Sequence, residues 1–181
     1  MCGFAAVINL NHQTVDIDVI RAMTDSLRHR GPDDQAFGLY SLSTGEFRVA
    51  ARDDLGYASA AFPTASTAVG FNRLSIQDTS SRGRQPMSSS CGRKHIVFNG
   101  EIYNAPQLRE QMVREGVVFR SNSDTEVILN LYQRAGMRQM LSRLNGMFAI
   151  CIIDLDRRSL MVAGITLASN LFIWLGQGKQ F

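Results

Sequence analysis

The sequence predicts a single domain of the α+β class. Short apolar or alternating runs, which are typical of strands, are interspersed with segments that repeat apolar residues at helical spacing. The chain has 181 residues, of which 45% are hydrophobic and 19% are charged, and this is enough for one globular domain with a substantial core. The elements of that domain can be assigned in order along the chain.

A strand followed by a helix is expected first. Residues 2–10 form an apolar run that indicates a buried strand, with Cys2 at its start. Residues 15–28 repeat apolar side chains at helical spacing and predict a short amphipathic helix. The sequence RHRGPDD at 28–34 places a Gly-Pro turn among charges of both signs, so a solvated loop is expected there, with a structural role for His29.

The position of Cys2 makes it a candidate nucleophile. If Met1 is removed, Cys2 carries a free α-amine beside its thiol. An α-amine with a pKa of about 8 can accept the thiol proton and later return it to a leaving group, so that no separate catalytic histidine is needed. Met-Cys-Gly alone is weak support for this role, since most cysteines near an N-terminus are ordinary.

Further strands are expected in the middle of the chain. Residues 36–51 alternate in the manner of two strands around a Ser-Thr-Gly turn, and residues 68–74 predict another strand. Arg73 ends that strand, where its guanidinium either binds a carboxylate at two points or forms a surface salt bridge. Residues 80–92 are rich in Ser, Arg, Gly and Pro and predict a mobile loop.

The strand expected over 95–98 runs into Asn99 and Gly100. An Asn-Gly pair is first of all a turn signal. The same geometry can also aim the Asn99 amide and the Gly100 backbone N–H at one point, as an oxyanion hole requires, and losing one such donor typically costs on the order of 3 kcal/mol of barrier lowering. The lack of a side chain on Gly100 would then let a substrate approach closely.

Two helices are expected next, over 105–115 and 124–144. Ser123 and Glu126 have the spacing of a capping box at the start of the second helix. Asp124 then lies in the first helical turn, where its carboxylate either interacts with the helix dipole or binds a substrate ammonium. The last strands are expected over 147–153 and 159–163.

The charge pattern argues against a nucleic-acid partner. The formal net charge is +3 and the isoelectric point is near 9.0, but the basic residues are scattered. The densest stretch, 82–94, holds only four of them. A membrane partner is not expected either, because the apolar run 161–175 is shorter than the roughly 20 residues that a spanning helix needs.

The cysteines favour a cytoplasmic protein without a metal site. Cys2, Cys91 and Cys151 lack metal-ligand spacing, and their odd number argues against a disulfide framework. The apolar stretch 3–10 has neither the basic flank nor the cleavage site of a signal peptide. A reducing compartment is therefore expected.

Together the motifs resemble a known family, the class II glutamine amidotransferase domain. Over residues 2–163 the chain resembles, more narrowly, the N-terminal glutaminase domain of the glutamine-hydrolysing asparagine synthetase family. RHRGPDD together with FNGEIYN points to that branch rather than to the sugar-phosphate or purine-pathway amidotransferases. The segments that carry the resemblance are Cys2-Gly3, RHRGPDD (28–34), RLSI (73–76), FNGEIYN (98–104), SDTEVIL (123–129) and LNGMFA (144–149).

The resemblance implies an N-terminal nucleophile hydrolase fold, a four-layer αββα sandwich of two antiparallel sheets. It also implies cleavage of the side-chain amide of L-glutamine. Cys2 would be the nucleophile and its own amine the general acid and base. A thioester on Cys2 would form with release of ammonia, and water would then free glutamate. This half-reaction requires no metal and no cofactor.

The resemblance assigns five further residues to the site. Asn99 and Gly100 would hold the tetrahedral oxyanion. Arg73 would bind the substrate α-carboxylate. Asp124, helped by the region of Glu101, would bind the α-ammonium.

The resemblance also implies a larger reaction scheme. In the family, ammonia passes to a synthetase domain that uses ATP and Mg to activate a carboxylate. The chain shows no Ser-Gly-Gly-containing pyrophosphate loop, so we expect that domain to be absent from it and to be a separate partner. The acceptor carboxylate and a homodimeric state are left open. The alternative to a working glutaminase is an inactive remnant of an asparagine synthetase-like gene.

Residues 164–181 depart from the family pattern, which continues Arg-Asp-x-x-Gly-x-Lys-Pro-Leu-Tyr at this point. The chain instead has GITLASNLFIWLGQGKQF. A permitted codon choice for residues 163–181, read one base out of register with one base restored at the junction, gives ARDHLGIKPLYLAGAGQAV. We therefore expect a domain over 2–163, a frameshifted tail over 164–181, and incomplete C-terminal strands.

Overall fold

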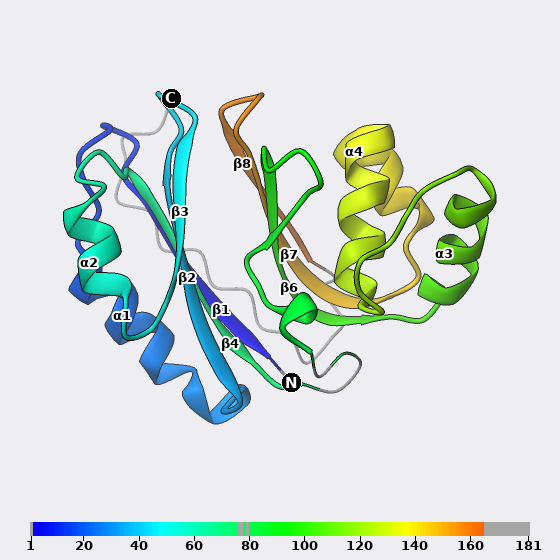
Figure 1. Cartoon of the computed structure of the whole chain (residues 1–181), viewed down its shortest axis with the longest axis horizontal. Helices are drawn as coiled ribbons and strands as arrows, with labels where there is room; N and C mark the ends of the chain where they lie inside the picture. The colour runs from blue at the N-terminus through cyan, green and yellow to red at the C-terminus, as the bar shows by residue number, and fades with distance from the viewer. Residues whose placement is uncertain (1, 76–77, 79, 165–181) are drawn as a thin grey trace.

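The protein is a sandwich of two antiparallel sheets with helices on both outer faces (Figure 1). The computed structural model describes residues 2–75, 78 and 80–164. Apart from Gly164, the tail expected to be frameshifted lies outside the described residues. No helix in the described part of the chain is long and apolar enough to cross a membrane.

The first sheet has the strand order β1-β4-β2-β3. β1 and β4 are antiparallel, with Gly3 opposite Asn72, so that Cys2 lies beside the residues that follow Arg73. Helices α1 and α2 cover the outer face of this sheet (Figure 1). The elements of this half are β1 (Gly3–Ile8), α1 (Ile17–Ser26), the 3-10 helix η1 (Arg28–Arg30), β2 (Asp34–Ser41), β3 (Glu46–Ala51), α2 (Leu55–Ala60) and β4 (Thr67–Arg73).

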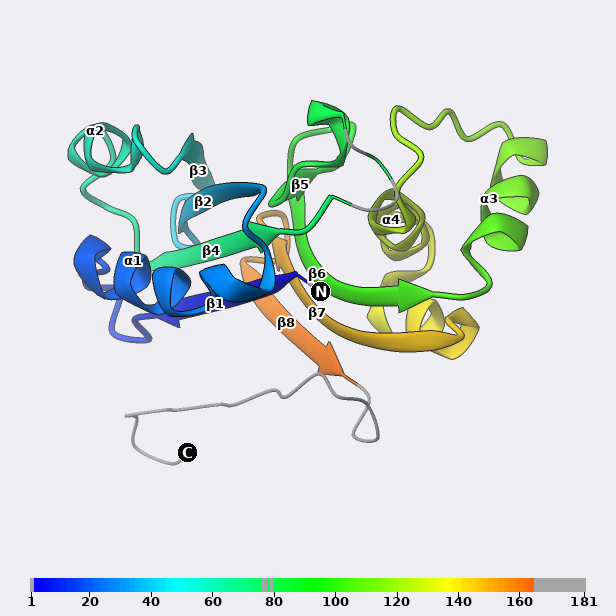
Figure 2. The ribbon, with the colours of Figure 1, turned by 90° about the horizontal axis from the view of Figure 1, so that it is seen from below.

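The second sheet has the order β5-β6-β7-β8, and helices α3 and α4 cover its outer face. Figure 2 shows the start of β1 between the two sheets, and β1 is in contact with β6. The elements of this half are the 3-10 helix η2 (Ser81–Gly83), β5 (Met87–Ser88), β6 (Lys94–Ile102), α3 (Ala105–Arg114), α4 (Asp124–Arg143), β7 (Gly146–Asp154) and β8 (Ser159–Gly164).

Alternation along the strands builds three separate cores. In β2, Phe37 and Leu39 point toward α1 and α2, whereas the next residue, Tyr40, points between the sheets. In β6, Ile96 packs toward α4 and Val97 packs between the sheets. The three clusters lie between four successive layers, and the predicted αββα sandwich is therefore confirmed.

The structure corrects two predictions for the second half of the chain. Asn99 and Gly100 do not form a turn: β6 continues through both, with Gly100 opposite Phe148 of β7. The segment 80–92 is not a featureless loop, because it forms η2 and β5. In both places pairing with neighbouring strands overrides the local preference of the residues for turns.

The start of α4 is capped differently from the expected capping box. The Ser123 hydroxyl caps the helix by accepting a hydrogen bond from the Thr125 N–H at 3.0 Å, and not from the Glu126 N–H that a capping box uses. The Glu126 carboxylate, however, accepts from the backbone N–H groups of Arg120 and Ser121 rather than from that of Ser123. It thereby holds the chain that leads into the helix. The helix is also interrupted at Gly136, whose φ of 74° is not helical.

Candidate active site

Cys2 lies at the entrance to the space between the sheets. Its side chain is half-buried and packs against the cluster between the sheets. The backbone N–H of Leu74 donates a hydrogen bond to the sulfur at 3.3 Å. Leu74 directly follows Arg73 at the end of β4, so this contact holds the sulfur next to the arginine predicted to bind substrate.

The RHRGPDD segment braces Cys2. The Arg30 Nε donates to the Cys2 carbonyl oxygen at 3.2 Å. A Cβ at Gly31 would lie 2.5 Å from a backbone oxygen of β4, so only glycine allows this close approach. The Asp33 carboxylate accepts from the Ser75 N–H at 2.7 Å, just beyond the residue that contacts the sulfur. The motif is therefore a structural support for the site and not a freely solvated loop.

Asn99 and Gly100 lie near the end of β6, on the sheet that faces Cys2. Asn99 is buried, with 7% of its surface exposed. Gly100 has a φ of 153°, and a Cβ there would lie 2.1 Å from the carbonyl oxygen of Met147. The close approach of β7 thus requires glycine at this position, independently of any substrate.

Arg73 is buried and does not form the surface salt bridge considered above. Its Nη1 donates to the Ser80 carbonyl at 2.9 Å, and its Nη2 donates to the Asp78 carbonyl. Among the described residues no carboxylate is paired with it. A guanidinium has five N–H donors, so others are left to bind an anion.

Asp124 is the first residue of α4, and only 7% of it is exposed. Its carboxylate accepts from the Ile102 N–H at 3.2 Å. Burial, with a smaller contribution from the negative charge of Glu101, raises the pKa of Asp124 to about 6. Glu101 itself is exposed. A buried carboxylate with a raised pKa is typical of a ligand-binding position, and it is not what the helix dipole alone would produce.

The sequence did not predict Gln85, which joins two parts of this site. Its amide oxygen accepts from the Phe98 N–H at 2.6 Å, and its amide nitrogen donates to the Thr125 hydroxyl at 3.3 Å. Gln85 therefore links the residue before Asn99 to the residue after Asp124. Only its position before Pro86 distinguished it, and the composition of the segment argued for mobility instead.

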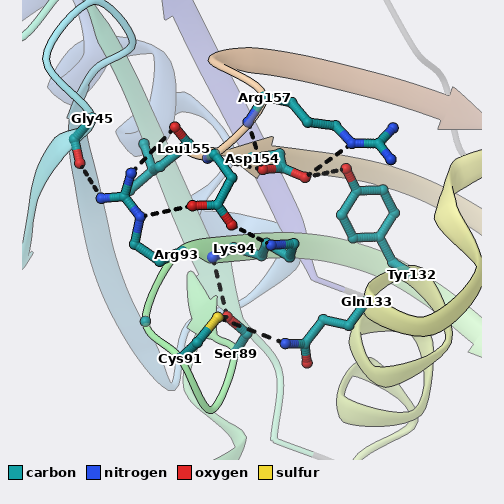
Figure 3. Close-up of polar contacts among 12 residues, drawn as sticks. Gly45, Ser89, Cys91, Arg93, Lys94, Tyr132, Gln133, Asp154, Leu155 and Arg157 are labelled. Atoms are coloured by element: carbon teal, nitrogen blue, oxygen red, sulfur yellow. Dashed lines mark hydrogen bonds and ion pairs between the residues drawn. The ribbon is translucent and has the colours of Figure 1, made fainter.

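A second polar cluster lies at the turn between β7 and β8, at the other end of these strands from Asn99 (Figure 3). The Tyr132 hydroxyl donates to the Asp154 carboxylate at 2.6 Å. Asp156 pairs with Arg93 at 3.0 Å and with Lys94 at 2.6 Å. These contacts hold the turn in place and have a structural role.

The remaining two cysteines lie in different environments. Cys151 is buried in the cluster between the sheets, and burial raises the pKa of its thiol to about 12. Cys91 is exposed beside Ser89, whose hydroxyl, as the main cause, lowers the pKa of the thiol. Cys91 is not part of the cluster against which Cys2 packs, whereas Cys151 is buried within it.

Comparisons with known proteins agree with this geometry. Residues 52–167 match the family model of the glutamine amidotransferase domain. Putative asparagine synthetase [glutamine-hydrolyzing] 2 of Methanocaldococcus jannaschii is 29% identical, over 100% of this chain and 33% of the relative. Asparagine synthetase [glutamine-hydrolyzing] 1 of Bacillus subtilis is 38% identical, over 84% of this chain and 20% of the relative. The chain thus spans a third or less of the length of these relatives.

The structural comparison concerns the fold alone. Glutamine phosphoribosylpyrophosphate amidotransferase from B. subtilis superposes with a TM-score of 0.67 at 22% identity, covering 86% of this chain and 35% of that chain. The N-terminal nucleophile hydrolase fold expected from the resemblance is thereby confirmed. The chain belongs to the glutamine amidotransferase domain family, and its sequence relatives are glutamine-hydrolysing asparagine synthetases.

Proposed function

We propose that this domain hydrolyses L-glutamine to glutamate and ammonia through a thioester on Cys2. The observation that carries the proposal is the place of the Cys2 sulfur, 3.3 Å from the Leu74 nitrogen and between the two sheets. Arg73 precedes Leu74 on one sheet, and Asn99 and Gly100 lie on the other. This arrangement offers a nucleophile, hydrogen-bond donors and a guanidinium around one space.

The reaction begins after removal of Met1. The free α-amine of Cys2 takes the thiol proton, and the sulfur attacks the side-chain carbonyl carbon of glutamine. Asn99 and Gly100 donate hydrogen bonds to the resulting oxyanion. The amine returns its proton to the departing nitrogen, and ammonia leaves. Water then attacks the thioester, which frees glutamate and restores the thiol.

The two ends of the substrate are held by opposite charges. Arg73 binds the α-carboxylate through N–H donors that it does not use within the protein. Asp124 binds the α-ammonium, with Glu101 adding negative charge nearby. Burial raises the pKa of Asp124 to about 6. A bound ammonium acts in the opposite direction, because its positive charge favours the ionised carboxylate.

We further propose that the ammonia serves a synthetase domain, since the relatives of the chain are glutamine-hydrolysing asparagine synthetases of which it spans only 20% to 33%. That domain would use ATP and Mg, and the glutaminase half-reaction would need neither. The glutaminase domain would extend over residues 2–163 and act in the cytoplasm. The alternative, an inactive remnant, predicts that Cys2 is never exposed as an N-terminal nucleophile.

The test combines intact mass with an ammonia assay. We expect the expressed protein to lack Met1, to gain one adduct from a glutamine-like diazo-ketone, and to release ammonia from glutamine. Cys2→Ala should abolish both the adduct and the activity. Cys91→Ala is the matched control, because it removes an exposed thiol outside the site and should change neither. A folded protein that retains Met1, or that takes up no adduct, would establish the remnant instead.

A further inference from the structure

Asp78 connects two parts of the site that lie far apart in the sequence. One of its carboxylate oxygens accepts from the Ser80 N–H at 2.9 Å and from the Ser80 hydroxyl at 2.6 Å. The other accepts from the Asn122 N–H at 3.0 Å. Asn122 lies two residues before Asp124, so Asp78 ties its own segment to the chain that leads into α4.

Asp78 and Ser80 also contact the side chain of Arg73. The Asp78 and Ser80 carbonyls both accept from the guanidinium. A Cβ on Gly83 would lie 2.4 Å from the Arg73 Nη2, which shows how closely η2 approaches the side chain. The position of the guanidinium is thus set by the carbonyls of Asp78 and Ser80 and by the close approach of η2.

Asp78 is therefore linked to both proposed binding groups for the ends of glutamine. Its carbonyl contacts Arg73, and its carboxylate holds the approach to Asp124. The α-carboxylate and the α-ammonium of an amino acid are attached to the same carbon atom, so the groups that bind them must be held at a fixed separation. A misplacement of about 1 Å can cost roughly 100-fold in rate.

We propose that Asp78 is a positioning residue for glutamine recognition, which holds Arg73 and Asp124 at a fixed separation. This inference rests on the proposed function and adds a residue that has no direct contact with substrate. All three contacts of the carboxylate come from hydrogen-bond donors, and the pKa of Asp78 is held below its usual value, chiefly by the Ser80 hydroxyl. An ionised carboxylate satisfies all three donors, whereas an amide cannot, because its nitrogen is itself a donor.

The test compares Asp78→Asn with the wild type. We expect the KM for glutamine to rise about 10- to 100-fold while kcat changes less than about 3-fold, because only the end groups lose their fixed partners. Glutaramic acid lacks the α-amino group, and 4-aminobutanamide lacks the α-carboxylate. The preference for glutamine over both should shrink in Asp78→Asn. Alkylation of Cys2 by iodoacetamide, which needs neither end group, should keep its rate.

Two further variants separate positioning from folding. Ser80→Ala removes the exposed hydroxyl that donates to the Asp78 carboxylate and that accepts from the Arg82 N–H at the start of η2. The protein should remain folded and show a KM increase of about 3- to 10-fold. Asp54→Asn is the matched control, because Asp54 is exposed and makes no side-chain capping bond at α2. It should leave all kinetic constants unchanged.

The outcomes distinguish this inference from the proposed function. An unchanged KM and unchanged end-group preference in folded Asp78→Asn or Ser80→Ala would overturn the positioning role while leaving the glutaminase intact. A wild-type protein that neither hydrolyses glutamine nor reacts with the diazo-ketone would overturn the proposed function and this inference together.

Discussion

At the scale of single residues, the ionisation of Asp124 governs the binding of a substrate ammonium. Burial is the main cause that raises its pKa to about 6, so the carboxylate is anionic above that pH and neutral below it. Only the anion can pair with an ammonium. The affinity of the domain for glutamine should therefore reach its full value above about pH 7 and fall as the pH drops through about 6.

The pH dependence of KM checks this expectation. KM for glutamine should rise up to about tenfold per pH unit below pH 6, because each unit reduces the ionised fraction about tenfold. Asp124→Asn should raise KM at neutral pH and remove that slope. Asp16→Asn, at an exposed helix cap outside the site, serves as the control. A slope that persists in Asp124→Asn would assign the titration to another group.

The candidate site residues could be predicted from motifs, but their hydrogen-bond partners could not. The motifs singled out Cys2, Arg73 and Asn99 as candidate site residues, and their roles stay predictions. The contacts of Arg73 with two carbonyls depend on how the chain returns after β4, which no local pattern encodes. Gln85 was missed for the same reason, since its burial depends on β6 and α4 together.

At the scale of elements, the pairing of β6 with β7 requires glycine at position 100. A Cβ there would lie 2.1 Å from the Met147 carbonyl oxygen, and the φ of 153° is unfavourable for other residues. Gly100→Ala should lower the free energy of unfolding by about 2 to 4 kcal/mol, because the strands must separate or the backbone must change. The urea midpoint measures this change independently of activity.

The matched control for this substitution is Gly56→Ala. Gly56 lies within α2, and a Cβ there would meet no atom within 4 Å. Alanine is favoured over glycine inside a helix by about 0.5 to 1 kcal/mol, so the urea midpoint should stay the same or rise. Equal midpoints for Gly100→Ala and the wild type would show that β6 and β7 tolerate the added atom.

Most elements could be predicted because their apolar patterns agree with the fold. The pair β2 and β3, the helix α3 and the strand β7 are found close to their expected ranges. The errors in strand assignment have a common physical cause, since sheet pairing decided them. Asn99 and Gly100 became strand because β7 supplies partners along their whole length, and β5 formed in an apparent loop because the edge of β6 was available.

At the scale of the whole molecule, the site depends on how the two sheets face each other. Cys2 and Arg73 belong to the first sheet, whereas Asn99 belongs to the second and Asp124 to the helix that covers it. The cluster between the sheets, which includes Tyr40, fixes their relative position. Sequence patterns predict which residues face inward, but they do not predict which strands pair or how the sheets pack. The relative positions of the site residues could therefore be found only from the structure.

The last prediction concerns the reading frame of the gene near the codon of Gly164, the final described residue. With a permitted codon choice, restoring one base there converts residues 164–181 into RDHLGIKPLYLAGAGQAV, and chance recovery of Gly-x-Lys-Pro-Leu-Tyr at the expected place is improbable. Fresh sequencing of the gene across this codon should reveal the additional base. Related genes with an uninterrupted frame encoding GITLASN would contradict the frameshift.

A protein expressed from the restored frame gives a physical check. The present tail contains the apolar run LFIWL at 171–175, whereas the restored frame has the less bulky PLYLA there and places Arg, Asp, His and Lys in the residues just before it. Contiguous apolar surface promotes association, so the restored protein should remain monodisperse at higher concentration in light scattering. Equal aggregation of the two proteins would show that this run is not responsible. A more monodisperse restored protein would attribute the association of the present chain to its tail.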